Sequence, residues 1–417
     1  MSNFGLVKEI HRIKVVLIMA LTLSKKAMAV KPSSTLAITA KAKELKAQGV
    51  DVVGFGAGEP DFNTPDNICT AAIEAINSGF TKYTPASGIA ELKEAICEKF
   101  KNFNGLDYKP SQIVISNGGK HSLTNVFSVI LNPGDEVIIP APYWLSYPEI
   151  VKLADGVPVF VRGEKETGYK VNVEMLQAVT TDKTRALILN TPSNPTGMIY
   201  TEDELRAIAD YAVKNDIYVV ADEMYEYLVY NGKKHVSIAS FNEEIYKRTI
   251  TVSGLAKSYA MTGWRIGYTG SSEEVAKLMG SVQSHQTSNP NSIAQKAAVE
   301  ALKGDQSTVK MMLGEFDKRR KYMYDRFAKM PYVSTLEPEG AFYVFVDVTD
   351  TLNMTYKGNK IETAAEFARI LIDEYNVAVV PCADFGFENH IRLSYAISVE
   401  QIDKGVTRIE QFLSELK

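Results

Sequence analysis

The chain has 417 residues, of which 45% are hydrophobic and 23% charged, and this is the composition of an ordinary globular protein with a large core. Its formal net charge of -4 at pH 7 provides no general attraction for nucleic acid. The length excludes a short peptide module and predicts two or three domains, or one large α/β unit.

The N-terminus carries a short apolar run, "VVLIMALTL" at residues 15–23, after several basic residues. A signal peptide would be uncharged between this run and its cleavage site, but Lys25 and Lys26 precede the small residues "AMA". The nine residues of the run are also too few to cross a bilayer. We therefore expect a cytoplasmic protein with no membrane attachment, in which residues 1–30 are a disordered extension or translation begins at Met19.

From Asp51 onward, helical patterns alternate with short Val/Ile-rich runs that are typical of buried strands. Predicted strands lie at residues 51–55, 112–116, 135–140, 157–161, 185–190, 217–222, 249–253 and 265–270, with helices such as 65–79, 120–131 and 202–216 between them. This alternation predicts an α/β fold, a three-layer sandwich with a mostly parallel central sheet and helices on both faces.

Near the C-terminus, the strand-like and helical runs between residues 340 and 396 precede an amphipathic helix at 399–416. These elements predict a separate α+β unit. We therefore expect a large domain at residues 63–304 and a smaller domain built from both chain ends, at residues 31–62 and 305–417.

Several common active-site motifs are missing from the sequence. The three cysteines show no C-x-x-C spacing, which predicts reduced thiols in a reducing compartment. The five histidines show no H-E-x-x-H or H-x-H spacing, so we expect no metal site. There is no G-x-S-x-G, no strand-following G-x-G-x-x-G and no P-loop, since His121 replaces the hydroxyl residue in "NGGKHS". Metal, serine-hydrolase and nicotinamide chemistries therefore lose support.

A glycine-containing turn follows the predicted strand at 112–116. Gly118 and Gly119 lead into a helix whose first amides would point at a shared anion site, and Lys120 comes next. A phosphate group could bind there. The alternative is an ordinary strand-to-helix turn in which the glycines only satisfy the geometry.

Two polar residues lie where predicted strands end. Asn194, in "TPSNPTG", follows the strand at 185–190, at the sheet edge where α/β proteins bind ligands. Asp222 ends the strand at 217–222, where an unpaired carboxylate would be costly and a cationic partner is expected. The alternatives are a proline-rich turn and a helix-capping aspartate.

Lys257 lies among small and apolar residues, and Arg265 follows eight positions later in a second apolar run. Desolvation lowers the pKa of a lysine and favours its nucleophilic form, although a surface lysine with a buried stem is the alternative. An amine for an aldehyde, a carboxylate for a ring nitrogen and donors for a phosphate are together what pyridoxal 5'-phosphate requires. The sequence therefore predicts this cofactor.

A series of motifs runs along the chain in this order: "AGEPDF", "TKYTP", "SNGGKHS", "PYWLSYPE", "TPSNPTG", "ADEMYEYL", "SGLAKSYAMTGWRIGY", "QTSNPNSIAQ", "GAFYVF" and "IRLSYA". From about Lys31 to the C-terminus this series resembles the class I aminotransferases of fold type I, and within them the bacterial aspartate aminotransferase branch. The resemblance implies a ping-pong transaminase whose partners are small molecules, namely amino acids and 2-oxo acids. L-aspartate would become oxaloacetate, and 2-oxoglutarate would become L-glutamate.

The resemblance also implies roles for the matching residues. Lys257 would bind the cofactor's aldehyde and, once freed, move the proton at the substrate's α-carbon. Asp222 would pair with the ring nitrogen, and Tyr225 and Asn194 would hydrogen-bond the phenolic oxygen. The remaining cofactor contacts would come from Trp144 on the ring face and from Gly118, Gly119, Lys120 and Arg265 at the phosphate. Tyr83 and Ser288 would reach the phosphate site of the neighbouring subunit, which implies a homodimer with shared active sites.

Substrate binding is implied in the same way. Arg392 would bind the α-carboxylate through a bidentate pair, in a pocket shared with Gly58, Asn194 and Trp144. One branch binds the distal carboxylate with an arginine where this chain has Ser284, so that role would fall to Lys120. Lys31, in "KPSST", begins a segment similar to one linked to prephenate as an amino acceptor.

The chain departs from the family pattern at one phosphate contact. Many relatives have a serine three residues before the lysine, but Gly254 occupies that position here and leaves Ser253 as the candidate. Three alternatives stay open on the same fold: an aminotransferase for aromatic or other neutral amino acids, a C–S lyase, or a non-catalytic effector-binding domain. The last would need a DNA-binding module larger than the 30 spare residues.

Overall fold

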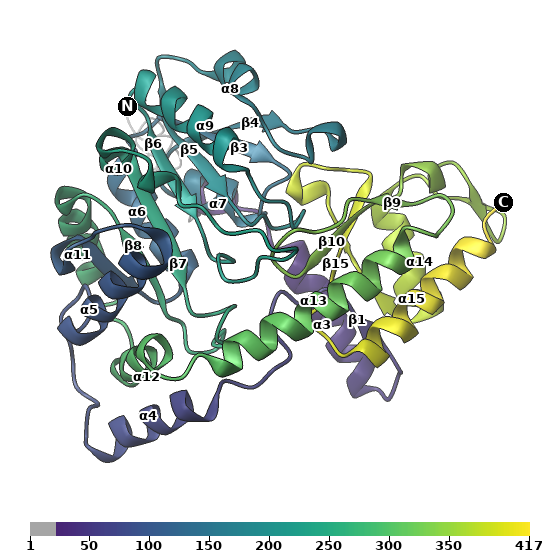
Figure 1. Ribbon diagram of the computed structural model, residues 1–417. Helices are drawn as coiled ribbons and strands as arrows, with labels where there is room; N and C mark the ends of the chain where they lie inside the picture. The colour runs from purple at the N-terminus through teal and green to yellow at the C-terminus, as the bar shows by residue number, and fades with distance from the viewer. Residues whose placement is uncertain (1–21) are drawn as a thin grey trace, which may run out of the picture.

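A computed structural model describes residues 22–417, and within this range seven strands form the central sheet (Figure 1). In sheet order they are β2 (Ile113–Ser116), β8 (Gly267–Gly270), β7 (Thr249–Gly254), β6 (Tyr218–Asp222), β5 (Thr184–Asn190), β3 (Glu136–Ala141) and β4 (Val157–Arg162). Only β8 runs antiparallel to its neighbours, β7 and β2. The prediction of a mostly parallel sheet is confirmed.

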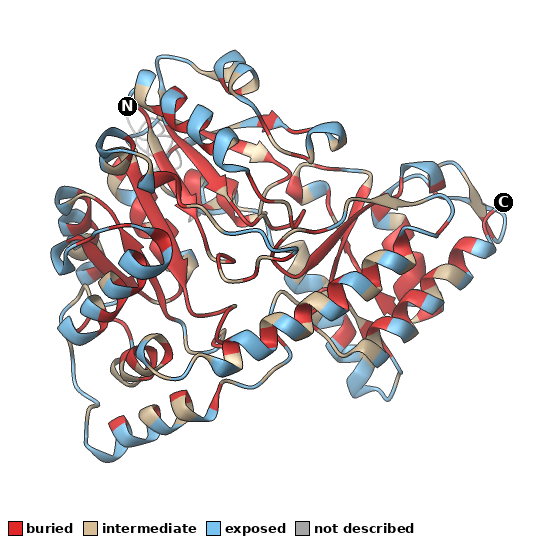
Figure 2. Ribbon diagram, in the orientation of Figure 1, coloured by how far each residue is buried: buried red, intermediate tan, exposed pale blue. Residues whose placement is uncertain are grey.

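Helices cover both faces of this sheet. The helices of this larger unit are α4 (Asp66–Asn77), α5 (Ala90–Lys99), α6 (Gly119–Ile130), α7 (Ser146–Leu153), α8 (Val173–Val179), α9 (Glu202–Lys214), α10 (Glu243–Arg248), α11 (Glu273–Gln286) and α12 (Ser292–Lys303), of which α4 packs against α12. In β6, Val220 packs among residues of α6, α7 and α11, whereas Val219 and Ala221 pack among residues of α8, α9 and α10. Because side chains alternate along a strand, this division confirms the three layers. Figure 2 shows most strands of the central sheet as buried, the edge strand β4 as partly exposed, and the outer helices as exposed along one side.

Local chemistry fixes where individual helices begin. At α9, the Thr201 side chain accepts from the Glu204 amide and the Glu204 carboxylate accepts from the Thr201 amide, which forms a capping box. At α6, Gly118 adopts φ +91°, a conformation that favours glycine, and turns the chain from β2 into the helix. The first backbone amides of α6 therefore lie close to the end of β2.

A second, smaller unit is built around a four-stranded antiparallel sheet. Its strands, in order, are β14 (Val380–Pro381), β15 (His390–Ser394), β10 (Tyr343–Asp347) and β9 (Ser334–Thr335). The helices and short strands around it are α3 (Ser34–Ala47), α13 (Ser307–Phe327), α14 (Ala364–Tyr375), α15 (Val399–Ser414), β1 (Val53–Gly54), β13 (Val377–Ala378), β11 (Thr355–Tyr356) and β12 (Asn359–Lys360).

Both ends of the chain contribute to this smaller unit. The predicted strand at 51–55 pairs as β1 with β13, in parallel, and does not join the central sheet. The Arg408 side chain of α15 donates to the Asp51 carboxylate at 2.7 Å. The α+β unit expected from the two chain ends is therefore present.

Residues 22–30, which the sequence placed in an extension, contain the short helix α2 (Lys25–Met28) and lie against α7. Lys26 Nζ lies 2.7 Å from the Asp155 carboxylate, and Lys152 Nζ donates to the carbonyl of Ala29. Met19 and most of the apolar run at 15–23 lie outside the described residues. Among residues 22–417, no helix combines the length and apolarity needed to span a bilayer.

Candidate active site

A cavity of about 280 Å³ lies at the carboxyl ends of β5 and β6, where residues of both sheets meet. Ten residues predicted from the sequence line it: Gly58, Gly119, Lys120, Trp144, Asn194, Asp222, Tyr225, Lys257, Arg265 and Arg392. The strand register explains this convergence, because Asn190 of β5 pairs with Asp222 of β6, which pairs with Val252 of β7. Because β5, β6 and β7 end side by side, the residues that follow these strands meet at the same edge of the sheet.

Asp222 is the buried acid of the cavity. Its carboxylate accepts from the Tyr147 hydroxyl at 2.7 Å and from the Met224 amide at 3.2 Å. Burial raises the pKa of Asp222 to about 6, and these two hydrogen bonds oppose the rise because they favour the ionised form. Asp222 forms no direct ion pair with a basic residue within residues 22–417. Because a buried carboxylate needs a cationic partner, Asp222 is suited to bind a cationic group of a ligand.

Lys257 lies just beyond β7, and its Nζ donates to the Gly58 carbonyl at 2.6 Å. Burial lowers the pKa of Lys257 to about 8, with Glu59 opposing and Arg265 adding to the decrease. A lysine with this pKa has a substantial neutral fraction near neutral pH, and the neutral amine is the nucleophile. The arrangement suits attack on a carbonyl carbon.

Arg265 and the start of α6 form a compact anion site. Arg265 adopts φ +57°, and its Nη1 donates to the Thr262 carbonyl at 2.9 Å. A Cβ at Gly118 would lie 2.2 Å from Arg265 Nη2, and a Cβ at Gly267 would lie 2.3 Å from the Gly119 amide nitrogen. The guanidinium therefore packs directly against the helix start, where backbone amides and the helix dipole also favour an anion.

Lys120 and Trp144 form one wall of the cavity. Lys120 Nζ lies 4.9 Å from the centre of the Trp144 ring, and burial lowers the pKa of Lys120, with Arg265 adding to the decrease. The indole face partly compensates the desolvated ammonium. An anionic group of a ligand would compensate it more fully.

Arg392 is almost completely buried in β15. It donates from Nη1 to Asn194 Oδ1 at 2.9 Å and from Nη2 to the Gly56 carbonyl at 3.0 Å. Its Nε has no hydrogen-bond partner among residues 22–417. Because buried donors are normally satisfied, this orphan Nε indicates a binding position for an acceptor.

The electrostatic balance of the cavity is strongly positive. Lys120, Lys257, Arg265 and Arg392 line it, and none of these four forms an ion pair with a carboxylate in the described part of the chain. Asp222 is the acid that lines the same cavity. Such a site attracts small ligands that carry several negative charges.

Two tyrosines of the site were not predicted from the sequence. Tyr147 of α7 donates to Asp222, and Tyr343 of β10 lies with its hydroxyl 2.8 Å from that of Tyr225. Both line the cavity. "PYWLSYPE" and "GAFYVF" were recognised as motifs, but a tyrosine in an apolar run is usually core, so the motifs alone did not assign these hydroxyls.

Five predicted site residues, Gly118 at the start of α6 among them, do not line the cavity. Tyr83 is 86% exposed, and Ser288 and Lys31 are also exposed. Ser253 is buried, and its hydroxyl donates to the Glu226 carboxylate at 2.5 Å instead of facing the cavity. Its role as a phosphate contact stays a prediction that this hydrogen bond does not support.

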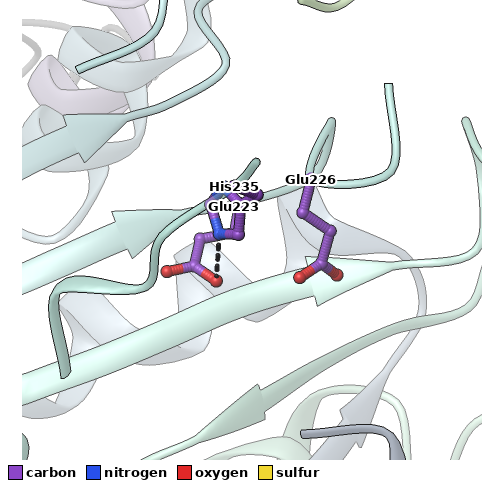
Figure 3. A group of neighbouring side chains, drawn as sticks. All are labelled: Glu223, Glu226 and His235. Atoms are coloured by element: carbon purple, nitrogen blue, oxygen red, sulfur yellow. Dashed lines mark ion pairs between the residues drawn. The ribbon is translucent and has the colours of Figure 1, made fainter. Parts of the chain in front are cut away.

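Glu226 belongs to a buried polar network that the sequence did not reveal. Figure 3 shows Glu223, Glu226 and His235 together, with Glu223 Oε2 2.9 Å from His235 Nε2. Lys99 forms an ion pair with Glu226, and Asn104 Nδ2 donates to both carboxylates. The Lys99 ammonium provides the cation for Glu226, and Glu223 is held by His235 and Asn104. The network thereby anchors the turn that carries Asp222 and Tyr225.

Comparisons with known proteins show which family the chain is similar to. A family model described as aminotransferase class I and II matches residues 50–409. An aspartate aminotransferase of Bacillus sp. strain YM-2 is 50% identical over 382 residues, 92% of this chain and 96% of that protein. An aspartate/prephenate aminotransferase of Cereibacter sphaeroides is 47% identical over 93% of this chain and 97% of its own length. The structure of Thermus thermophilus aspartate aminotransferase with maleate superimposes with a TM-score of 0.89 at 42% identity, over 94% of this chain and 100% of that one.

Proposed function

The chain belongs to the class I and II aminotransferases, and on that premise we propose that it binds pyridoxal 5'-phosphate in this cavity and transfers the amino group of L-aspartate to 2-oxoglutarate. The observation that carries the proposal is the set of four cations without carboxylate partners around one buried acid. A phosphate, an α-carboxylate and a distal carboxylate would neutralise three of these cations. The fourth, Lys257, would react with the aldehyde as the neutral amine.

The residues present fit this cofactor. Arg265 with the amides of Gly119 and Lys120 suits a phosphate, and the orphaned Nε of Arg392 suits a carboxylate at a separate position. Asp222 suits a protonated ring nitrogen, since a buried carboxylate needs a cationic partner. When bound, pyridoxal phosphate supplies an aldehyde for amines and a ring that withdraws electrons from the substrate's α-carbon.

The chain's own residues would then perform the remaining work. Lys257 would remove the proton from the substrate's α-carbon and then deliver it to the cofactor's aldehyde carbon. Removing the proton requires the neutral amine, which burial favours. Asp222 holds the ring-nitrogen proton. Arg392 and Asn194 hold the α-carboxylate, so the Cα–H bond is presented to Lys257 in one orientation.

Dicarboxylate preference is supported by Lys120. Its side chain lines the cavity and forms no ion pair with an acid among the described residues. The solved relative whose structure contains maleate, a four-carbon dicarboxylate, is consistent with a second anionic position in this fold. We therefore place the distal carboxylate of aspartate at Lys120.

A second activity, with prephenate as amino acceptor, is favoured by the N-terminal segment. Ser33, Thr35 and Leu36, within and beside "KPSST", line the cavity, and similar proteins are named aspartate/prephenate aminotransferases. Formation of arogenate from prephenate and glutamate would support this activity. Absence of product at high enzyme concentration would exclude it.

A homodimer with shared active sites is part of the proposal. Tyr83 and Ser288 lie outside the cavity of their own chain, and Tyr83 is largely exposed. An exposed tyrosine that completes the phosphate site of a second copy would account for this placement.

A panel of half-reactions tests the function directly. The loaded protein is mixed with one amino acid at a time, and loss of the cofactor's visible absorbance is followed. Fast conversion by aspartate and glutamate, with slow conversion by alanine and tyrosine, is the expected result. Equal or faster conversion by tyrosine or alanine would instead favour an aminotransferase for neutral amino acids.

A further inference from the structure

Tyr343 occupies the junction between the two halves of the cavity. It is the first residue of β10, it is 1% exposed, and it lines the cavity. Its hydroxyl lies 2.8 Å from the Tyr225 hydroxyl, although 118 residues separate the two in sequence. A Cβ at Gly58 would lie 3.0 Å from the same hydroxyl, so the cavity wall encloses it.

The ring of Tyr343 also supports Arg392. The Arg392 guanidinium lies 4.4 Å from the centre of this ring. In the sheet, Tyr343 pairs with Ser394 while Arg392 pairs with Phe345, so the two residues are diagonal neighbours on adjacent strands. The ring face thus offers a cation–π contact to a buried guanidinium that has no acidic partner in the described part of the chain.

We propose that Tyr343 is a positioning residue with two separable parts: its hydroxyl orients the Tyr225 hydroxyl toward the cofactor, and its ring holds Arg392 for the substrate carboxylate. This proposal rests on the proposed function, because it takes pyridoxal phosphate as the cofactor and Tyr225 as the donor to its phenolic oxygen. It adds a link between the cofactor half and the substrate half of the site, made by one side chain.

Counting protons fixes the direction of the hydroxyl contact. A tyrosine hydroxyl has one O–H and can accept further hydrogen bonds. If Tyr225 donates its proton to the phenolic oxygen, the hydrogen bond between the two tyrosines has to be donated by Tyr343. A donor that itself accepts a hydrogen bond is polarised and donates more strongly. The Tyr343 hydroxyl therefore strengthens the donation from Tyr225.

The hydroxyl is tested by Tyr343→Phe, which keeps the ring. Weaker donation from Tyr225 leaves more negative charge on the phenolic oxygen, and this charge stabilises a nearby proton on the nitrogen that joins Lys257 to the cofactor. The pH midpoint of the cofactor's absorbance change should therefore rise by a few tenths of a pH unit. Because the ring remains, the KM for aspartate should stay close to the wild-type value.

A double-mutant cycle tests whether the effect passes through Tyr225. In a Tyr225→Phe background, Tyr343→Phe should cause no further shift of the midpoint, since the hydroxyl that Tyr343 orients is gone. Full additivity of the two shifts would overturn the proposal. Tyr343→Leu tests the ring: it should shift the midpoint as Tyr343→Phe does and also raise the KM for every amino-acid substrate.

Tyr395→Phe is the matched control. Tyr395 is fully buried and donates to the Ala341 carbonyl at 3.1 Å, but it does not line the cavity. Its loss should lower stability without moving the midpoint. An unchanged midpoint in Tyr343→Phe, or a shift of equal size in Tyr395→Phe, would overturn the inference. A wild-type protein that binds no cofactor would instead overturn the proposed function itself.

Discussion

The chemistry of single residues in this site follows from burial without neutralisation. Lys257 and Asp222 have pKa values moved to about 8 and about 6, mainly by desolvation, toward the range in which proteins carry out proton transfer. The pKa of Lys120 is also lowered, mainly by desolvation. A site of this kind gains its stabilising partners from the ligand, so each residue should report on one part of that ligand.

Lys120→Ala tests the distal carboxylate. Loss of the ammonium should raise the KM for aspartate by at least tenfold and leave the KM for alanine nearly unchanged, because alanine has no distal carboxylate. Steady-state kinetics with both amino donors provide the measurement. A similar increase for the two substrates would mean that Lys120 serves the cofactor or the fold.

Tyr147→Phe tests the environment of Asp222. The variant removes a donated hydrogen bond that lowers the pKa of Asp222, so this pKa should rise above its value of about 6. Binding of a cationic ring nitrogen needs the ionised acid, and cofactor affinity should therefore begin to fall at a higher pH than in the wild type as the solution is acidified.

Titration of the unloaded protein with pyridoxal phosphate between pH 5 and 8 measures this change. Tyr108→Phe is the control, since Tyr108 is a buried tyrosine whose hydroxyl contacts Thr251 and which does not line the cavity. Superimposable pH profiles for wild type and Tyr147→Phe would contradict the assigned role.

At the scale of elements, the close contact between α6 and β8 shapes the anion site. Gly267 of β8 and Gly119 of α6 approach so closely that a Cβ at position 267 would lie 2.3 Å from the Gly119 amide nitrogen. The Arg265 guanidinium packs against Gly118 at the same place. Backbone has to move if a side chain is added there, and the amides aimed at the phosphate move with it.

Gly267→Ala should therefore weaken cofactor binding and lower the free energy of unfolding by about 1–3 kcal/mol, the usual cost of overpacking. Gly314→Ala is the control: it lies in α13 with no atom within 4 Å of its added Cβ. This change should stabilise the protein by about 0.5–1 kcal/mol, because alanine favours helix. Denaturant unfolding and cofactor titration of both variants provide the measurements. Equal changes in stability and cofactor affinity for Gly267→Ala and Gly314→Ala would contradict the prediction.

The sequence patterns predicted the positions of helices and strands better than they predicted which strands pair with each other. The Val/Ile-rich runs located every strand of the central sheet, and the motif positions placed Asp222 at the end of β6 and Lys257 just beyond β7. Local patterns carry no information on strand direction or long-range pairing, so neither the antiparallel β8 nor the pairing of β1 with β13 could be predicted. Tyr343 was missed for the same reason, since its contacts with Tyr225 and Arg392 exist only after the two sheets pack together.

At the scale of the whole molecule, two units from separate parts of the chain meet at the cavity, and a second copy of the chain is proposed to complete it. Lys257→Ala removes the amine, and Tyr83→Ala removes the residue expected to act in the neighbouring subunit. Each variant alone should be nearly inactive. In a mixed dimer, one site would combine Lys257 from one chain with Tyr83 from the other and would be intact.

Unfolding and refolding the two variants together should therefore restore activity, while the same treatment of either alone should not. Light scattering on the mixture checks that the species is a dimer. If the mixture shows only the summed activity of its components, Tyr83 and Lys257 do not act across subunits.

Lys257 is proposed to form the covalent link to the cofactor, and chemical mapping identifies the residue that carries this link. Protein loaded with pyridoxal phosphate is treated with borohydride, which reduces a carbon–nitrogen double bond to a stable amine, and is then digested and analysed by mass spectrometry. We expect a pyridoxyl-phosphate adduct on Lys257 and none when Lys257 is replaced by alanine. A protein that carries no adduct, or carries it on Lys120 with Lys257 unmodified, would contradict this expectation.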